Sequence, residues 1–352
     1  MSISELARDK VKNLVPYASA RLSMSGGSVW LNANENALST QYQLSGDYNR
    51  YPDCQPPALI QAYATYAGVP ANMVLTSRGA DEGIELLIKS FCEPGKDRVT
   101  ICPPTYGMYK ISAHSQDVEV NTVPLTAELT LDLPALFAAP ATKLVFICSP
   151  NNPTGDLIPR QQIIEVLEFF AGKALVVLDE AYIEFAPEAS VVNLLADYPH
   201  LVILRTLSKA FALAGLRCGF TLAQPPVIAA LKQMIAPYPV PAPVADIAVQ
   251  ALSKEGQQQM RSRVQTILRE RDHFSRFAAD LPYVSQVYST AANYVLLSVP
   301  DAAAVVSAIA AKGILIRNQS SQLGLGQVVR VSIGSPAEMQ QLKAVMADLS
   351  FS

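Results

Sequence analysis

Short apolar runs alternate with amphipathic segments along most of the chain. Segments 58–66, 81–92 and 159–170 carry apolar residues at helical spacing, which predicts helices. Short, mostly apolar runs predict strands at 73–76, 99–102, 144–148, 175–178 and 201–204. Strands that are apolar on both faces and alternate with helices are typical of a parallel sheet buried between helices. The pattern therefore predicts an α/β fold.

The C-terminal part of the chain has a different order of elements. Four alternating prolines between residues 237 and 243 predict a stiff extended connector, and a long helix is predicted over 257–277. Further strands are predicted at 294–299, 314–317 and 328–333, with helices at 302–312 and 337–349. We therefore expect a large domain over 37–275 and a smaller α+β domain over 276–352, which residues 1–36 join as an N-terminal segment.

Composition and charge narrow the classes of function. The 352 residues are 50% hydrophobic and 16% charged, so a large core can form without disulfides or metals. The net charge of -3 leaves no cationic excess to neutralise a nucleic-acid backbone. Five scattered cysteines and three isolated histidines form no disulfide or metal-binding pattern. The N-terminus is charged and lacks the apolar core of a signal peptide, so we expect a soluble, cytoplasmic protein without a metal.

Motifs of three common enzyme classes are incomplete or missing. Gly324-Leu325-Gly326 lacks the third glycine of a dinucleotide-binding motif, and no G-x-S-x-G of the α/β-hydrolases occurs. The acidic strand end at 175–180 resembles that of P-loop ATPases, but no phosphate-binding loop precedes it. These absences disfavour dinucleotide, hydrolase and nucleotide-hydrolysis chemistry.

Polar residues follow the predicted strands at the ends where open α/β sheets bind ligands. Lys209 precedes seven residues without polar side chains, and burial would lower the pKa of its amine and make it a Schiff-base nucleophile. Arg217 is suited to a bidentate phosphate contact, to which Thr206 and Ser208 would add hydroxyl groups. Asp179, at the end of an apolar strand, is placed to pair with a protonated pyridine nitrogen.

Further segments complete this predicted site. Tyr182 is placed to hydrogen-bond a phenolic oxygen on the ring, and segment 149–155 follows a strand end. In segment 77–82, the backbone N–H groups after Gly79 would bind an anion at a helix start. Tyr106 would stack on an aromatic ring. Each feature alone has an ordinary structural explanation, but together they predict a site for a phosphorylated aromatic aldehyde.

These stretches resemble the fold-type I, pyridoxal-phosphate-dependent aminotransferases, and among them the histidinol-phosphate aminotransferases. The likeness spans nearly the whole chain and is carried by 31–36, 48–53, 77–82, 103–109, 149–155, 178–183, 205–219 and 330–334. It implies a large domain with a mostly parallel sheet flanked by helices and a smaller α+β domain. It also implies pyridoxal 5′-phosphate as cofactor and a homodimer with shared active sites. The implied reaction is transamination between L-histidinol phosphate and 2-oxoglutarate, giving imidazole acetol phosphate and L-glutamate in histidine biosynthesis.

The resemblance implies catalytic roles for three residues. Lys209 would form the Schiff base with the cofactor and transfer the proton. Asp179 would pair with the pyridine nitrogen, and Tyr182 would hold the ring oxygen. The other cofactor contacts implied within the subunit are Ala80, Asp81, Tyr106, Asn152, Thr206, Ser208 and Arg217.

The resemblance also implies contacts with substrate and with a second subunit. Tyr51 would reach the phosphate of the neighbouring subunit's cofactor, and Arg330 would bind the substrate anion. Additional implied substrate contacts are Tyr17, Asn34 and Arg317. One departure from the family pattern is Ala37, where relatives commonly have proline.

Alternative functions remain open from the sequence. A threonine-phosphate decarboxylase and an aromatic amino acid aminotransferase share these motifs, because the choice of bond broken depends on substrate placement. A pyridoxal-phosphate-binding transcription regulator would need a DNA-binding domain ahead of the aminotransferase-like part, where only about 35 residues lie. A non-catalytic α/β domain would leave the spacing of Asn152, Asp179, Tyr182, Lys209 and Arg217 to chance.

Overall fold

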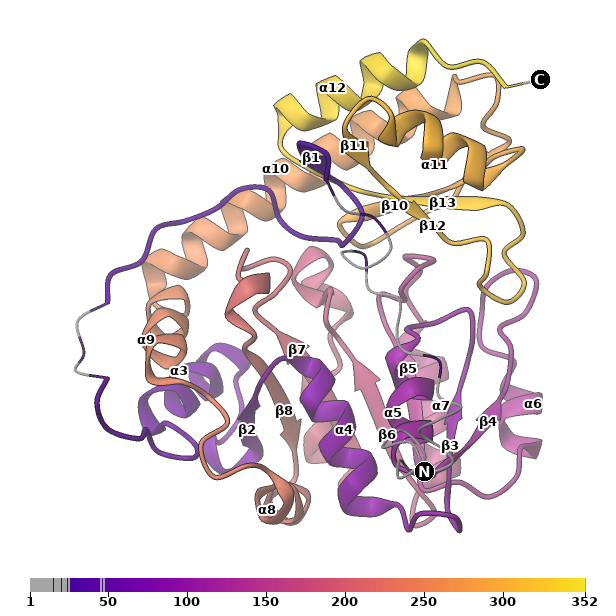
Figure 1. The fold of residues 1–352 in the computed structure, drawn as a ribbon. Helices are drawn as coiled ribbons and strands as arrows, with labels where there is room; N and C mark the ends of the chain where they lie inside the picture. Colours follow the sequence, from indigo (N-terminus) through magenta and orange to yellow (C-terminus); the bar gives the residue numbers. More distant parts are fainter. Residues whose placement is uncertain are drawn as a thin grey trace, which may run out of the picture.

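The large sheet has seven strands in the order β2-β8-β7-β6-β5-β3-β4 (Figure 1). The structure is a computed structural model that describes residues 15, 20, 24, 26–44, 46 and 48–351. The strands are β2 (Val74–Ser77), β3 (Arg98–Ile101), β4 (Glu119–Thr122), β5 (Leu144–Cys148), β6 (Leu175–Asp179), β7 (Leu201–Thr206) and β8 (Gly219–Ala223). Neighbours from β7 to β4 pair in parallel, whereas β8 runs antiparallel between β7 and β2. The expected mostly parallel sheet is confirmed.

Two strands of this sheet were not predicted, and both lack a clear apolar run. In β4, Glu119 and Thr122 are exposed, as befits an edge strand. In β8, Thr221 interrupts the apolar residues and Gly219 opens the strand. Both strands therefore depend on pairing with a neighbour more than on their own hydrophobic pattern.

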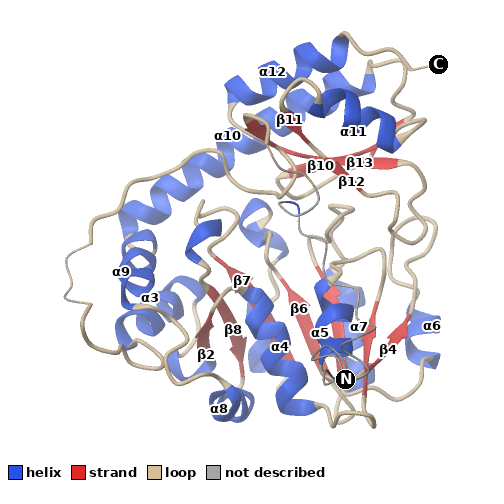
Figure 2. Ribbon diagram, viewed as in Figure 1, coloured by secondary structure: helices blue, strands red, loops and turns tan. Residues whose placement is uncertain are grey.

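Helices cover both faces of the large sheet (Figure 2). One face carries α4 (Ala80–Phe91), α5 (Met108–Ser115) and α8 (Pro225–Met234). The other carries α3 (Pro57–Ala67), α7 (Arg160–Phe170) and α9 (Ala242–Ala251). Successive residues of β5 face opposite sides of the sheet. Leu144 and Phe146 lie in the core under α4, α5 and α8, whereas Val145 and Ile147 lie in the core under α3, α7 and α9. This period of two confirms that the sheet is buried on both faces.

Short helices complete this part of the chain. They are α6 (Leu133–Ala138), η2 (Ala71–Met73), η3 (Ile183–Phe185), η4 (Pro187–Ala189), η5 (Val192–Ala196) and η6 (Ala214–Leu216). The predicted extended connector is shorter than expected, because Pro241 is the N-cap of α9 and Pro243 lies in its first turn. Proline is tolerated there because the first N–H groups of a helix have no intrahelical partner.

A smaller sheet lies above the carboxyl ends of the large one (Figure 1). It has the order β12-β13-β10-β9, made of β9 (Gln286–Val287), β10 (Tyr294–Ser298), β12 (Arg317–Asn318) and β13 (Val328–Ser332). Three helices accompany it: α10 (Lys254–Ala279), α11 (Ala302–Ala310) and α12 (Pro336–Ala347). The long helix α10 packs on α9 at one end and on β10 and α12 farther along.

The N-terminal segment meets the small sheet. Strand β1 (Val29–Trp30) pairs in parallel with β11 (Ile314–Leu315), and β12 begins two residues after β11 ends. The single strand predicted over 314–317 is therefore two short strands that pair with different partners. Buried Ile316 separates them.

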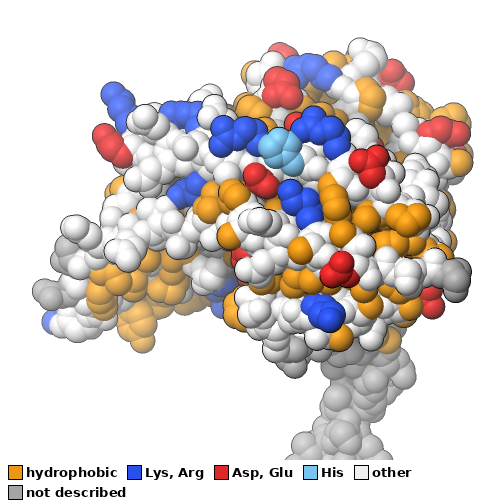
Figure 3. Space-filling view, turned by 90° about the horizontal axis from the view of Figure 1, so that it is seen from above, with side chains coloured by type: hydrophobic (Ala, Val, Ile, Leu, Met, Phe, Trp, Pro, Cys, Tyr) orange, Lys and Arg blue, Asp and Glu red, His pale blue; other side chains and the backbone are white. Residues whose placement is uncertain are grey.

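Charged side chains are mixed on the face seen from above. In Figure 3, the described Lys and Arg side chains are interspersed with Asp and Glu. Among the described helices, none is long and apolar enough to cross a bilayer.

Candidate active site

A pocket of about 650 Å³ lies where the carboxyl ends of β5, β6 and β7 face the small sheet. Segment 32–35, strand β12 and the turn residues Gln319, Ser321 and Gln322 complete its wall. Most of the predicted cofactor and substrate residues line it: Asn34, Ala80, Asp81, Tyr106, Asn152, Asp179, Tyr182, Thr206, Ser208, Lys209, Arg217, Arg317 and Arg330. Tyr17 lies outside the described residues. The fold thus brings together residues that are widely separated in the sequence.

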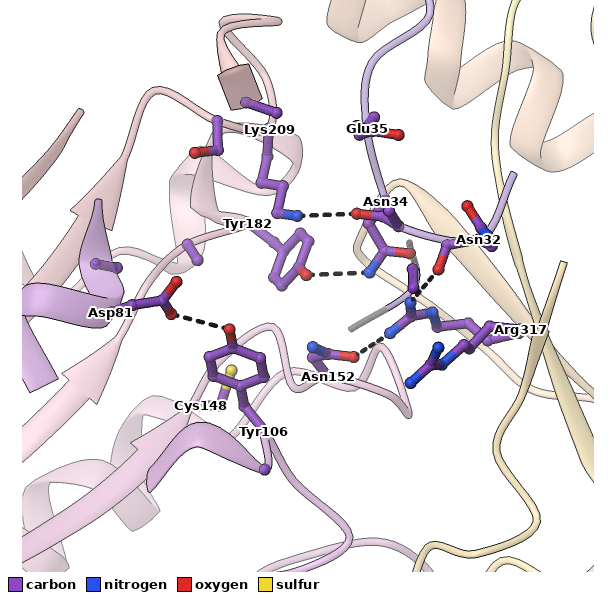
Figure 4. A pocket seen from close by; sticks show the side chains of 18 of the residues that line it. Asn32, Asn34, Glu35, Asp81, Tyr106, Cys148, Asn152, Tyr182, Lys209 and Arg317 are labelled. Carbon is purple, nitrogen blue, oxygen red and sulfur yellow. Dashed lines mark hydrogen bonds between the residues drawn. The ribbon is translucent and has the colours of Figure 1, made fainter. Parts of the chain in front are cut away.

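Lys209 projects into this pocket from the loop after β7 (Figure 4). Its Nζ donates a hydrogen bond to the carbonyl oxygen of Ala33 at 3.1 Å. Burial, reinforced by the positive charge of Arg330, lowers the pKa of Lys209 to about 8. An amine with such a pKa is partly neutral near neutral pH and is therefore a competent nucleophile or base.

Asp179 lies at the end of β6 and is only 3% exposed. The backbone N–H of Ala181 donates to its Oδ1 at 3.0 Å, and the Tyr109 hydroxyl donates to its Oδ2 at 2.6 Å. Burial raises the pKa of Asp179 to about 6, although both hydrogen bonds oppose this. The carboxylate is thus buried, hydrogen-bonded and open to the pocket, which suits it to a cationic ring nitrogen.

An anion cradle forms at the start of α4. Gly79, with φ of 82°, precedes the helix and supplies no capping side chain, so the first N–H groups of α4 remain available. Arg217 Nη2 lies 3.3 Å from Asp81 Oδ2, and Nη1 lies 3.5 Å from Ser208 Oγ. Thr206 Oγ1 donates to Ser208 Oγ at 2.8 Å. Helix terminus, guanidinium and hydroxyl groups therefore converge as a phosphate site requires.

Tyrosines and an asparagine lie between the cradle and the small sheet (Figure 4). The Tyr106 hydroxyl donates to Asp81 Oδ1 at 2.9 Å, which holds its ring at the pocket wall. Tyr182 OH accepts a hydrogen bond from Asn34 Nδ2 at 3.0 Å. Asn152 Oδ1 accepts one from Arg330 Nη1 at 2.5 Å.

Arg330 enters the pocket from β13 of the small sheet. It is 6% exposed, and its Nη2 donates to the carbonyl oxygen of Asn32 at 3.2 Å. Its buried Nε has no hydrogen-bond partner among the described residues. A buried guanidinium N–H without a partner is unusual in a folded protein, and the group is suited to a bound anion.

Asn34 hydrogen-bonds residues of both the large domain and the small sheet through all its polar groups. Its backbone N–H donates to Ser332 Oγ, and Ser332 Oγ donates to its Oδ1. Its carbonyl oxygen accepts from Asn293 Nδ2, while its side-chain amide reaches Tyr182 as described above. The residue has φ of 53°, a left-handed conformation that asparagine tolerates better than most residues.

Tyr51 lies apart from the pocket. It is 80% exposed and stacks on Tyr238, with ring centroids 4.3 Å apart and an interplanar angle of 11°. The two rings form a small exposed aromatic patch on the surface of the large domain.

Several residues that line the pocket or contact its lining were not predicted from the sequence. Tyr109 bonds Asp179, Ala33 and Asn32 supply backbone acceptors, and Gln319 lines the far wall. Backbone acceptors carry no sequence signal. The sequence offered no clear signal for Tyr109, which lies in α5, whereas Tyr106 precedes that helix. Among the described residues, no group of three or more His, Cys, Asp or Glu is placed to hold a metal ion.

Comparison with known proteins identifies the class to which this pocket belongs. Residues 27–345 match the family model for aminotransferases of class I and II. The crystal structure of histidinol-phosphate aminotransferase from Sinorhizobium meliloti in complex with pyridoxal-5′-phosphate has a TM-score of 0.84 to this chain, covering 97% of each. The sequence identity to it is 24%, so this likeness concerns the fold alone.

Two further relatives are much more similar in sequence. Histidinol-phosphate aminotransferase of Escherichia coli (strain SMS-3-5) is 52% identical over 344 residues, covering 97% of both chains. The protein of the same name from Yersinia pestis (strain Pestoides F) is 51% identical over 350 residues, covering 99% of this chain and 92% of that protein. The chain therefore belongs to the class I and II aminotransferases and, within them, to the histidinol-phosphate aminotransferases.

Proposed function

We propose that the chain transfers an amino group between L-histidinol phosphate and 2-oxoglutarate, with pyridoxal 5′-phosphate as cofactor. One observation carries this conclusion: a lysine, a buried carboxylate and an anion cradle share one pocket, in a chain about half identical to histidinol-phosphate aminotransferases. The products would be imidazole acetol phosphate and L-glutamate.

The donor groups of the pocket fit this cofactor. The N–H groups of Ala80 and Asp81, with Thr206, Ser208 and Arg217, would hold its phosphate. At the ring, Asp179 would hold the nitrogen, Asn152 and Tyr182 the phenolic oxygen, and Tyr106 one face. When bound, the cofactor supplies an electron sink for the pair released at the substrate's α-carbon.

Asp179 and Lys209 would do the acid–base work. Asp179, buried at the end of β6 and lining the pocket, would keep the positive charge on the ring nitrogen. Lys209 Nζ would remove the substrate's α-proton and return it to a neighbouring carbon. A positioned base of this kind contributes roughly 10²–10⁴-fold. The pKa of about 8 keeps a useful fraction of this amine neutral.

Arg330 would recognise both substrates. Histidinol phosphate presents a phosphate, whereas glutamate presents a carboxylate, and a guanidinium fork binds either group through paired N–H donors. The unpartnered buried Nε supports this assignment, because an anion would satisfy it. Tyr17, Asn34 and Arg317 would be the remaining substrate contacts.

We also propose a homodimer in which Tyr51 contacts the partner's cofactor phosphate. The exposed, stacked position of Tyr51 supports this, since the residue is available to a second subunit. A large domain over 37–275, a small domain over 276–352 and a cytoplasmic location complete the proposal. Sedimentation of the purified protein and cell fractionation test the dimer and the location.

The absorption spectrum of the purified protein tests the reaction. The visible band of the bound cofactor should disappear when histidinol phosphate is added without a keto acid, and return with 2-oxoglutarate. A band that histidinol phosphate leaves unchanged would contradict the substrate and direct attention to threonine phosphate. Absence of any band after addition of the cofactor would contradict the role of Lys209.

A further inference from the structure

Tyr109 is a buried tyrosine that faces the carboxylate of Asp179. It lies on α5, is 0% exposed, and its hydroxyl donates to Asp179 Oδ2 at 2.6 Å. This length is typical of a strong hydrogen bond from a hydroxyl to an ionised carboxylate. The mechanism proposed above assigns no role to this side chain.

The packing around Tyr109 leaves its ring little freedom. The ring stacks on Phe146 of β5, with centroids 4.9 Å apart and an interplanar angle of 11°. Tyr106 meets its edge at 5.6 Å and 88°. The hydroxyl is therefore held toward Asp179 by contacts from both sides.

The two hydrogen bonds at Asp179 leave room for a third partner. Tyr109 occupies Oδ2 and the Ala181 N–H occupies Oδ1, while an ionised carboxylate has about four acceptor positions. Burial raises the pKa of Tyr109 well above its ordinary value, so its hydroxyl remains a donor. The carboxylate is thus fixed in orientation, and its remaining acceptor positions are available to a ligand in the pocket.

We propose that Tyr109 is a positioning residue whose hydroxyl keeps Asp179 ionised and aimed at the nitrogen of the cofactor ring. The part of this inference that concerns the ring rests on the proposed function. The part that concerns the ionisation of Asp179 applies to the protein without cofactor.

The surroundings of Asp179 show why a donor is needed there. Burial and the charge of Asp81 raise its pKa, whereas Tyr109, the Ala181 N–H and Lys209 lower it, for a balance at about 6. The ionisable groups that face or influence this carboxylate, by element, are Tyr109 on α5, Cys148 on β5, Asp81 on α4, Lys209 after β7 and Tyr182 after β6. Removal of the Tyr109 hydroxyl would take away one group that lowers this pKa, while burial would still raise it. Asp179 would then be partly protonated near neutral pH.

The experiment compares Tyr109→Phe with Tyr63→Phe. Tyr63 is also buried and stacked on a phenylalanine, Phe220, but no hydrogen bond joins it to Asp179 in the structure. The carboxyl resonance of Asp179 is followed by NMR during pH titration of protein without cofactor, and is assigned by its loss in Asp179→Asn. Tyr109→Phe should raise the midpoint from about 6 by about one to two units, and Tyr63→Phe should leave it unchanged. An unchanged midpoint in Tyr109→Phe overturns the proposal.

Cofactor affinity gives a second measurement. At neutral pH, Tyr109→Phe should bind pyridoxal phosphate more weakly, by roughly tenfold or more. This difference in cofactor affinity between the variant and the wild type should shrink as the pH rises above the midpoint of the variant, because Asp179 is then ionised in both proteins. A deficit that is constant with pH would indicate only altered packing and would overturn the proposal.

The wild-type protein provides a test that needs no folded variant. The hydroxyl proton of Tyr109 should change its chemical shift with the same midpoint as Asp179, and this change should be absent from Asp179→Asn. A hydroxyl proton that does not respond to pH overturns the assignment. These titrations use no substrate, so failure of transamination would overturn the proposed function and leave the ionisation of Asp179 by Tyr109 standing.

Discussion

Replacement of Gly219 by alanine should disturb the anion cradle without touching any charged group. Gly219 opens β8, where its backbone lies against Gly79 and Ala80 at the start of α4. An added Cβ would lie 2.3 Å from the carbonyl carbon of Gly79 and 2.5 Å from the nitrogen of Ala80. These are backbone atoms, so no side-chain rotation can relieve the contact. The loop that carries the predicted phosphate-binding N–H groups must move instead.

The size of the effect follows from this distance. Ordinary van der Waals contact begins at 3.4 Å, so the Gly79–Ala80 backbone has to retreat by roughly 1 Å. Overpacking of a dense core costs about 1–3 kcal/mol of the free energy of unfolding. A 1 Å displacement of positioned groups can cost about 10²-fold in function. We therefore expect Gly219→Ala to lose about 1–3 kcal/mol of stability and to bind pyridoxal phosphate roughly 10²-fold more weakly.

Two measurements and one control test this reasoning. Urea unfolding without cofactor gives the free energy of unfolding, and titration of the visible absorption band gives the cofactor affinity. Gly83→Ala is the control, because its Cβ on the same helix would meet only side-chain atoms, Leu204 Cδ2 at 3.0 Å and Thr221 Oγ1 at 3.1 Å. Gly83→Ala should keep nearly normal cofactor affinity. If Gly219→Ala binds cofactor as tightly as the wild type, the steric reasoning is refuted.

Four further predictions concern charged groups. Arg330→Ala should raise KM for both histidinol phosphate and glutamate by about 10-fold or more, and an effect on glutamate alone would contradict dual recognition. The pKa of Lys209 is about 8 in the protein without cofactor. The rate of its reaction with pyridoxal phosphate should therefore rise about tenfold per pH unit below pH 8 and level off above it. A rate that does not change from pH 6 to pH 8 would exclude this lysine as the reacting group. The same lowered pKa means that the unfolded chain binds more protons between about 8 and 10.5, so this group should make stability rise with pH across that window. Arg205→Met would leave Glu180 buried without its cation, now 2.7 Å away, and should cost about 3–5 kcal/mol by urea unfolding. The double variant Arg205→Met/Glu180→Leu should recover much of that loss. If Arg205→Met alone leaves the free energy of unfolding unchanged, the ion pair does not contribute to stability.

Much of the fold was predictable because burial leaves a periodic signal. The central strands β5, β6 and β7 lie within one or two residues of their predicted bounds, since each is a run of apolar residues enclosed on both faces. Strand β4, by contrast, is a half-exposed edge and carries no such signal. The single strand predicted over 314–317 is two short strands, since Ile314–Leu315 pairs with β1 and Arg317–Asn318 pairs with β13.

The candidate site was predictable to the extent that it follows strand ends. Asp179, Asn152 and Thr206 come at or after the carboxyl ends of parallel strands, and parallel strands must end at the same edge of a sheet. Lys209 and Arg217 follow in the next loop and, like them, line the pocket. For these residues, chain order and strand direction together determine proximity.

Contacts between distant segments were decided only by the tertiary structure. Tyr109 reaches Asp179 across 70 positions, Lys209 reaches Ala33 across 176, and Arg330 reaches Asn152 across 178. No periodicity fixes these pairings, because they depend on which helix face meets which strand and on how the small sheet sits above the large one. The sequence by itself determined the layers and the chemical groups at the edge of the sheet. The packing of separate elements determined which of those groups are desolvated, which are hydrogen-bonded, and therefore at what pH each can act.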